Sequence, residues 1–245
     1  QTIKIPSGEI TNAPFLLAIA RAAMRVIMST GMSTLAEVEA ALGVLAYGFV
    51  GPTAAIPRCG ELEQAFGSDA GQEALRNRVT LLHCTTEYPA PFSEINLRAM
   101  DTMAEAFGLP VGYSDHTMGI HISLAAVARG AQVIEKHVTL DRNLPGPDHK
   151  ASLEPDELRQ LVRQTREVEL ALGRRLKYPS LSERKNRAVA RKSLVVARAV
   201  RAGELFTEDN LTSKRPGTGV SPFAYWQTLG QAARRDYVPD EDIDT

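Results

Sequence analysis

Cysteine is scarce in this 245-residue sequence, the net charge is close to zero, and no long apolar run occurs. The two cysteines, Cys59 and Cys84, form no disulfide framework and indicate a reducing compartment, the cytoplasm. With 28 basic and 29 acidic residues, no global field favours nucleic acid or an anionic membrane. Arg or Gly interrupts every apolar stretch well before the roughly 20 residues that a spanning helix needs. We therefore expect neither a nucleic-acid nor a membrane partner, and an anionic ligand would need a local site.

What is present is the composition of an ordinary globular protein, 44% hydrophobic and 23% charged. The length suffices for one large domain, or for one medium and one small domain. The chain opens Gln-Thr-Ile-Lys-Ile-Pro, without an initiator Met or a leader pattern, as if in the middle of a strand. We expect further residues to precede it in the native protein.

Residues 1–150 alternate short β-rich runs with longer helical patterns. Predicted strands are Thr2–Ile5, Val26–Ser29, Val79–Cys84, Pro110–Tyr113 and Val133–His137. Predicted helices span residues 13–24, 34–47, 93–106 and 119–129, followed by a strong helix at Pro155–Leu172 with Pro at its start and Gly173 after its end. Strand, helix and strand in succession indicate parallel strands joined by helical crossovers.

Polar side chains follow each predicted strand, and this regularity selects the fold class. In (β/α)8 barrels of the TIM type, loops at the carboxyl ends of the strands build the site, whereas a Rossmann fold carries Gly-x-Gly-x-x-Gly after its first strand. That fingerprint does not occur here, so the pattern favours the barrel. Only five of eight strands are visible, which predicts three more βα units upstream. Residues 49–71, rich in Gly and Pro, are predicted to be a connecting surface segment.

A change in the sequence pattern, from alternating strands and helices to a basic stretch and then short segments, indicates a second domain. We assign residues 1–173 to the barrel, 174–191 to a basic linker and 192–245 to a compact domain close to the lower size limit for independent stability. In the small domain the pattern predicts a strand at Ser193–Val200, a short helix at Thr207–Leu211, a rigid loop at Lys214–Gly219 and a helical piece at Pro222–Leu229.

Two histidines are the candidate metal ligands. His116 follows one predicted strand and His137 ends the next, so in neighbouring barrel strands both imidazoles would emerge at one rim. Two imidazoles with open positions suit Mn, Fe, Co or Zn. The alternative, that each is a hydrogen-bonded core histidine, stays open from the residues alone. His83 and His121 are predicted to be structural, and His149 is ambiguous.

Other rim residues could bind an anion or move protons. Lys4 lies at the end of the first strand, Ser7 follows it and Ser29 ends the second strand. Such groups hold a phosphate or carboxylate, although Ser-Thr-Gly is also ordinary helix-cap material. Three carboxylates at or near the rim could place a water, move a proton or bind sugar hydroxyls; they are Glu9, Glu135 and Asp148. Glu135 could equally pair with Lys136 or another base.

Two stiff loops hold further candidates. Tyr88 precedes Pro-Ala-Pro, which would aim its ring at the site, with plain loop packing as the alternative. Arg215 stands before Pro-Gly-Thr-Gly, where a rigid guanidinium suits an amide carbonyl or a carboxylate of a substrate, with a solvated turn as the alternative.

Taken in order, the motifs resemble the bacterial nonulosonic acid synthases, which include N-acetylneuraminate and N,N′-diacetyllegionaminate synthases. The motifs are Ile5-Pro-Ser-Gly-Glu9, Met28-Ser-Thr-Gly-Met32, Leu82-His-Cys-Thr-Thr-Glu-Tyr-Pro89, Gly112-Tyr-Ser-Asp-His-Thr117, Ile134-Glu-Lys-His137, Gly146-Pro-Asp-His149 and Lys214–Gly219. The resemblance implies an eight-stranded β/α barrel, an antifreeze-like (SAF) domain and a domain-swapped homodimer. It also implies condensation of phosphoenolpyruvate with an N-acetylmannosamine-like sugar and water, giving a nine-carbon 2-keto acid and phosphate.

The resemblance also implies roles for individual residues. His116 and His137 would ligate a divalent metal, usually Mn²⁺, which polarises the sugar aldehyde. Glu9 would position the water, Glu135 and Asp148 would bind sugar hydroxyls or handle protons, and Arg215 of the partner subunit's copy would bind the N-acyl carbonyl. The groups implied to hold phosphoenolpyruvate are Lys4, Ser7, Ser29, Thr86, Tyr88 and Ser114.

Thr86 departs from the neuraminate-type enzymes, which carry Asn there, and together with the Ala151–Leu158 segment it looks closer to the legionaminate branch. Two alternatives to the synthase stay open at this point. One is a truncated, non-catalytic carbohydrate-binding or ice-binding protein that uses the small domain. The other is a metal-dependent aldolase that acts on pyruvate and releases no phosphate.

Overall fold

The computed structural model describes residues 1–22, 24–53 and 55–244, so Ala23 in the predicted helix 13–24, Ala54 in the predicted surface segment and Thr245 lie outside the described residues. The chain forms two compact units, Gln1–Gly173 and Arg174–Thr245, which divide where the predicted barrel portion ends. No helix within the described ranges has the length and apolar character needed to cross a membrane.

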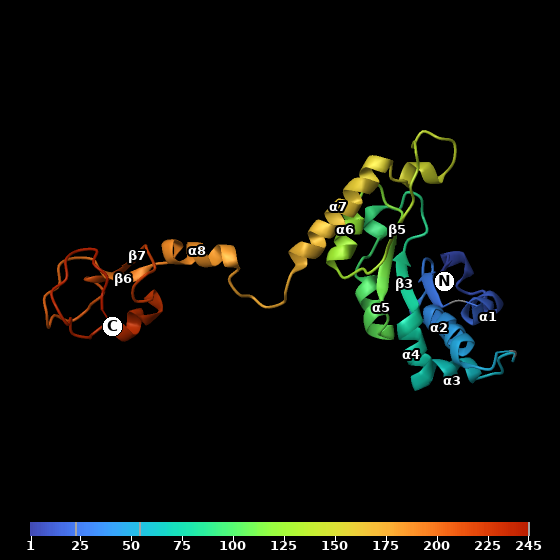
Figure 1. Ribbon diagram of the computed structural model, residues 1–245, viewed down its shortest axis with the longest axis horizontal. Helices are drawn as coiled ribbons and strands as arrows, with labels where there is room; N and C mark the ends of the chain where they lie inside the picture. The colour runs from blue at the N-terminus through green and yellow to red at the C-terminus, as the bar shows by residue number, and fades with distance from the viewer. Residues whose placement is uncertain (23, 54, 245) are drawn as a thin grey trace. The chain divides into compact units, whose positions relative to one another are not determined.

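The first unit is a parallel five-stranded sheet surrounded by helices (Figure 1). Its strands are β1 (Thr2–Ile5), β2 (Arg25–Ser29), β3 (Val79–Cys84), β4 (Val111–Asp115) and β5 (Ile134–Lys136), paired in sequence order. Its helices are α1 (Ala13–Ala22), α2 (Leu35–Val50), α3 (Glu61–Gly67), α4 (Asp69–Arg78), α5 (Ala99–Phe107), α6 (His121–Ala128) and α7 (Pro155–Leu172), with single turns at Ser7–Glu9, Phe92–Glu94 and Asp148–Ala151. Each crossover between strands contains a helix, as the alternating pattern predicts.

The sheet is strongly curved. Lys4 on β1 and Glu135 on β5 form an ion pair, with Nζ 3.1 Å from Oε2, although three strands lie between their own. In a flat sheet, four steps of about 4.8 Å would hold these strands about 19 Å apart. The sheet must therefore curl until its first and last strands face each other across the concave side. This curvature, with helices on the outside, confirms the β/α-barrel fold class.

Local sequence explains most element boundaries. Thr34 begins α2 with a reciprocal capping box to Glu37, and Glu154 with Glu157 does the same for α7, where Pro155 occupies the first turn. The predicted helix at 93–106 begins only at Ala99, because Asn96 adopts a left-handed backbone with φ 50°.

Residues 49–71, predicted as a connecting surface segment, contain α3 and the start of α4, two helices that the sequence pattern did not predict. Helix α3 begins after Gly60, and α4 begins after Ser68, whose side chain accepts a hydrogen bond from the Gly71 amide. Leu75 of α4 is fully buried. Gly60 and Gly67, which made this segment look like a connection, lie at the two ends of α3. Packing against α2 stabilises both α3 and α4.

The second unit has its own small core. Its elements are α8 (Leu181–Ala190), β6 (Ser193–Val196), β7 (Leu211–Lys214), a turn at Pro222–Ala224 and α9 (Tyr225–Thr228), with β6 and β7 antiparallel. The buried residues are Leu194, Val196, Val200, Phe206, Leu211, Ala233, Tyr237 and Ile243. The stretch predicted as a linker contains helix α8, which Ser180 and Glu183 cap reciprocally.

Two predictions inside this unit need correction. The strand predicted over Ser193–Val200 ends at Val196. Residues 207–210 form a turn and not a helix, because the Asn210 amide group accepts from the Thr207 N–H at 2.8 Å and donates to the Leu205 carbonyl at 3.0 Å. Such side-chain bonds to the backbone compete with helix formation. Leu211 then enters β7 opposite Val196.

His83 lies within β3 as predicted, and its burial makes a testable contribution to stability. Its Nε2 is 2.6 Å from the Ile95 carbonyl. Burial lowers the pKa of His83, and the Ile95 carbonyl only partly opposes this. The unfolded chain then binds more protons below its ordinary pKa of about 6.5, so the free energy of unfolding falls as pH drops through that value.

We expect His83→Gln, which can still donate to the Ile95 carbonyl, to unfold with a shallower dependence on pH between about 8 and 5 than the wild type. Urea midpoints measured across that range test this, with His121→Gln at the exposed start of α6 as control. Burial also lowers the pKa of His116, so part of the slope should remain in the variant. Identical slopes for wild type and His83→Gln would refute the contribution of His83.

Candidate functional site

The predicted site residues of the first unit gather where the parallel strands end. Ser7 follows β1, Ser29 ends β2, and Thr86 and Tyr88 follow β3. Ser114 and His116 lie at the end of β4, and Glu135 and His137 at the end of β5. Because all five strands run in the same direction, these groups share one edge of the sheet, the edge that carries the sites of β/α barrels.

The structure brings the two candidate metal ligands together. The ring centroids of His116 and His137 are 5.4 Å apart, and the Tyr88 ring lies 4.2 Å from the first and 5.5 Å from the second. The residue His116 is buried, whereas the side chain of His137 is 33% exposed. The three rings thus make a cluster that is open on the His137 side.

The hydrogen bonds of His116 suit a metal ligand. Its Nδ1 lies 2.7 Å from the Thr85 carbonyl, which can only accept, so Nδ1 carries the proton and Nε2 keeps its lone pair. Burial lowers the pKa of His116, which disfavours the charged imidazolium. A backbone carbonyl that orients the ring in this way is the usual outer partner of a ligating histidine.

Few other side chains near these rings could act as metal ligands. The Asp148 carboxylate is 3.7 Å from His137 Nδ1, and its side chain is 56% exposed. Within the described part of the chain, no group of three or more His, Cys, Asp or Glu side chains is arranged to hold a metal ion. The two imidazoles are thus the ligands that the described residues offer to a divalent ion, whose other positions would be open to substrate, water or further residues.

Glu135 connects the strands at this edge. Its Oε1 accepts a hydrogen bond of 2.8 Å from Ser114 Oγ, and its Oε2 pairs with Lys4 at 3.1 Å. Ser114 Oγ is also 3.4 Å from His116 Nε2. The pairing of Glu135 with Lys136, one of the two alternatives from the sequence, does not occur. The carboxylate instead lies between a lysine and a serine that are both predicted to bind phosphoenolpyruvate.

A second group of polar atoms surrounds Gly31, a residue that the sequence reasoning did not single out. The Gly31 amide donates to Ser7 Oγ at 3.0 Å, and Ser7 Oγ lies 3.1 Å from Cys84 Sγ. A Cβ atom at Gly31 would meet Ser7 Oγ and Cys84 Sγ at 2.8 Å and would also clash with Thr86 Oγ1. Only glycine leaves room for this convergence. The Ser-Thr-Gly run could have indicated it, but the same run is ordinary cap material.

Three predicted residues make no side-chain hydrogen bond to either of these clusters; they are Glu9, Ser29 and Arg215. Glu9 accepts a hydrogen bond of 2.7 Å from Asn12, its near neighbour in the chain. Ser29 is buried to 2% exposure, and its Oγ has no hydrogen-bond partner within the described structure. Arg215 belongs to the second unit, where its Nε donates to the Ala190 carbonyl at 2.8 Å and the residue is exposed.

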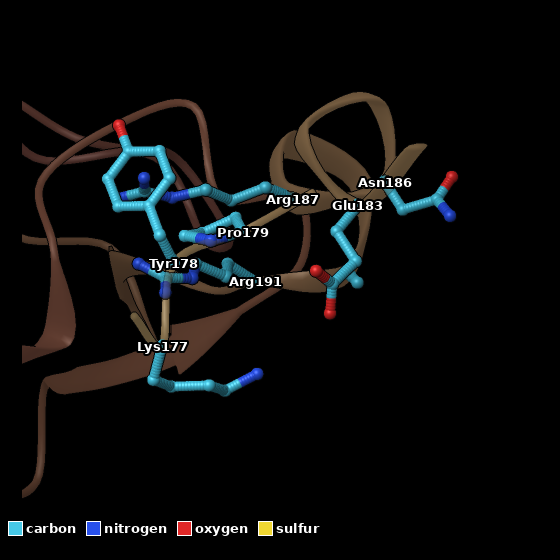
Figure 2. A pocket seen from close by; sticks show the side chains of 8 residues that line it. Lys177, Tyr178, Pro179, Glu183, Asn186, Arg187 and Arg191 are labelled. Atoms are coloured by element: carbon cyan, nitrogen blue, oxygen red, sulfur yellow. The ribbon is translucent and has the colours of Figure 1, made fainter. Parts of the chain in front are cut away.

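A separate hollow of about 450 Å³ lies against α8 in the second unit (Figure 2). Its walls include the side chains of Lys177, Tyr178, Arg187 and Arg191. None of the predicted site residues lines it. The predicted site residues of the first unit lie at the rim of the curved sheet and do not line this hollow.

A curled parallel sheet with external helices and polar side chains gathered at its carboxyl edge defines a protein of the β/α-barrel class, here joined to a small β-containing unit. Comparison with known families identifies both parts. The chain belongs to the NeuB family, whose sequence model matches residues 1–177, and residues 191–243 match the SAF domain. The resemblance seen in the sequence motifs is thereby confirmed.

Individual relatives agree with this assignment. The chain is similar to the N,N′-diacetyllegionaminic acid synthases of Campylobacter jejuni (52% identity over 97% of this chain and 64% of that protein) and Legionella pneumophila (42% over 90% and 56%). Among solved structures, it resembles the N-acetylneuraminic acid synthetase of Leptospira borgpetersenii in complex with citrate, with a TM-score of 0.60 and 34% identity over 76% of this chain and 55% of that one. The chain thus spans less than two thirds of the length of these relatives.

Proposed function

We propose that the protein to which this chain belongs is a nonulosonic acid synthase. It condenses phosphoenolpyruvate with an N-acylated amino sugar and water, and releases a nine-carbon 2-keto acid and phosphate. The observation that carries this proposal is the pair of imidazoles, His116 and His137, 5.4 Å apart beside the Lys4–Glu135 pair at the rim. The similarity to two N,N′-diacetyllegionaminic acid synthases, together with Thr86, favours a legionaminate-type product over N-acetylneuraminate.

His116 and His137 would hold the divalent cofactor, Mn²⁺, through their ring nitrogens. When bound, such an ion supplies Lewis-acid polarisation of the open-chain sugar aldehyde. The Thr85 carbonyl supports this role, because it orients the His116 ring and leaves Nε2 free. Tyr88 packs against both rings, and burial is the main cause that raises the pKa of its phenol, so it remains a neutral hydrogen-bond donor.

The remaining rim residues divide between the two substrates. Lys4 supplies the positive charge for the anionic phosphoenolpyruvate, and hydroxyl groups supply directed donors. The hydroxyl donors are Ser7, Ser29, Thr86, Tyr88 and Ser114. Glu135, held between Lys4 and Ser114, and Asp148, beside His137, would bind sugar hydroxyls or move protons, and Glu9 would orient the attacking water.

The second unit would complete the site from another copy of the chain. We propose a cytoplasmic, domain-swapped homodimer in which the partner subunit's Arg215 binds the N-acyl carbonyl. The small core of this unit and its exposed aromatic side chains, Phe223 at 85% and Trp226 at 77%, support an interface on its surface. A rigid guanidinium before Pro216 suits a directed bond to a carbonyl.

Phosphate release from phosphoenolpyruvate tests the reaction. The full-length protein, supplied with Mn²⁺ and mono- or di-N-acylated mannosamine derivatives, is expected to release phosphate only when both substrates are present. Turnover of pyruvate without phosphate release would instead indicate an aldolase. Sugar binding with no turnover of any derivative would indicate a non-catalytic carbohydrate-binding protein and would refute the proposed function.

A further inference from the structure

The strands β4 and β5, which lead to His116 and His137, also carry a pair of charged residues, Asp115 and Lys136. These two side chains lie on the face of the sheet opposite to the histidines. Side chains alternate along a strand, so Ser114, Glu135 and His137 face the concave side of the sheet while Asp115 and Lys136 face the helices. Lys136 lines a hollow between β5, α6 and α7, which lie side by side in Figure 1. Asp115 immediately precedes His116, and Lys136 immediately precedes His137.

Asp115 and Lys136 form an ion pair that is almost completely buried. Lys136 Nζ lies 3.1 Å from Asp115 Oδ2, with side-chain exposures of 3% and 0%. The two residues are also direct partners in the β4–β5 register. The pair therefore links the last paired positions of both strands, one residue before each candidate ligand.

Further hydrogen bonds tie this pair to the turn around His116. Asp115 Oδ1 accepts from the Thr117 amide at 2.8 Å and from Thr117 Oγ1 at 2.7 Å, and Oδ2 accepts from Ser123 Oγ at 2.5 Å. Lys136 also donates to the Thr117 carbonyl. His116 thus lies between Asp115 and Thr117, which this hydrogen-bond network holds in place. The network also includes Lys136, the residue before His137.

Stability alone does not account for this arrangement. The desolvation of two buried charges offsets most of their mutual attraction, so well-packed apolar side chains stabilise such positions equally well or better. What apolar side chains do not provide is a set of directed bonds with one geometry. A buried, fully bonded ion pair can therefore specify the position of the backbone more sharply than packing does.

We propose that Asp115 and Lys136 are a positioning pair, which fixes the backbone on which His116 and His137 stand and so sets the separation of the two imidazoles. The metal-binding consequence rests on the proposed function, whereas the effect on the backbone does not. Neither side chain touches the concave site, so the pair acts only through the two histidines.

The decisive variant is Asp115→Asn with Lys136→Met in the full-length protein, because it removes both charges and leaves neither one buried alone. We expect it to fold and to bind Mn²⁺ about 10-fold more weakly than the wild type in titrations with the metal alone. The matched control is Ile134→Val on the same strand and the same face, which removes one methylene and no polar contact. Its Mn²⁺ affinity is expected to be unchanged.

Hydrogen exchange provides a readout that needs no metal. In the double variant, amides in peptides covering residues 114–118 and 136–139 should exchange faster, while β2 should keep its wild-type protection. If the double variant does not fold, Ser123→Ala, which removes one bond to Asp115 and no charge, should shift both readouts in the same direction by a smaller factor.

Two results would separate the claims. A folded double variant with wild-type Mn²⁺ affinity and wild-type exchange in both peptides would overturn the positioning pair. A wild-type protein that binds no Mn²⁺ would overturn the proposed metal site only, and the exchange of the two peptides would then decide the positioning pair by itself.

Discussion

Replacing either His116 or His137 with alanine is expected to abolish turnover and to remove bound Mn²⁺ from the full-length protein. The two rings lie 5.4 Å apart, and the described part of the chain offers no cluster of three acidic, histidine or cysteine side chains that could take over. Loss of one imidazole from a two-imidazole site leaves too few protein ligands to hold the ion. We expect a fall in rate of at least three orders of magnitude, equivalent to about 4 kcal/mol of transition-state stabilisation.

The matched control is His121→Ala. His121 begins α6, and its ring centroid lies 5.1 Å from that of Phe92. This variant should keep its bound Mn²⁺ and its turnover. Metal content is measured on the purified proteins, and binding of phosphoenolpyruvate is measured separately. Normal metal content in His116→Ala or in His137→Ala would refute the ligand assignment, whatever the change in rate.

Gly31→Ala is expected to raise the KM for phosphoenolpyruvate about 100-fold, although it adds a single methyl group. The new Cβ would lie 2.8 Å from both Ser7 Oγ and Cys84 Sγ and would also clash with Thr86 Oγ1. These atoms must move apart, and Ser7 and Thr86 are two of the proposed contacts to the substrate anion. Overpacking of this kind costs about 1–3 kcal/mol, and a loss of about 2.7 kcal/mol in binding corresponds to a 100-fold change.

Gly8→Ala is the natural control, because Gly8 follows Ser7 in the loop after β1 and a Cβ there would meet no atom within 4 Å. We expect its KM for phosphoenolpyruvate to match the wild type. Steady-state kinetics at saturating sugar, with melting temperatures for both variants, distinguish a local effect from global destabilisation. A wild-type KM in folded Gly31→Ala would show that the groups around Gly31 do not contact phosphoenolpyruvate.

Much of the fold was predictable because its signals are local. Short β-rich runs gave all five strands of the sheet to within two residues at each end, and the near-continuously apolar runs among them indicate strands covered on both faces. Helix α7 was predicted with its observed limits, since Pro155 and Gly173 mark its ends. Helices α3 and α4 were missed because Gly60 and Gly67 mask their short patterns, and their stability comes from packing against α2.

The site was predictable to the extent that it follows the strands. The strand order places His116, His137, Ser114 and Glu135 at one edge, and the structure brings these four together as the pattern implies. The sequence left open whether Glu135 pairs with Lys136 or with another base. The answer, Lys4, depends on the curvature of the whole sheet, because Lys4 stands 131 positions earlier and three strands lie between β1 and β5.

By itself, the sequence determined the class of fold, the family and the residue types available at the rim, because hydrophobic period, helix caps and motif order are properties of short segments. Only the tertiary structure decided which of these residues meet. The Lys4–Glu135 pair, the convergence on Gly31 and the buried Asp115–Lys136 pair all join segments that are far apart in the chain. Sheet curvature, strand register and the side of the strand that each side chain occupies decide which residues become partners. Local sequence indicates the side of the strand, but it determines neither the curvature of the sheet nor the register of its strands.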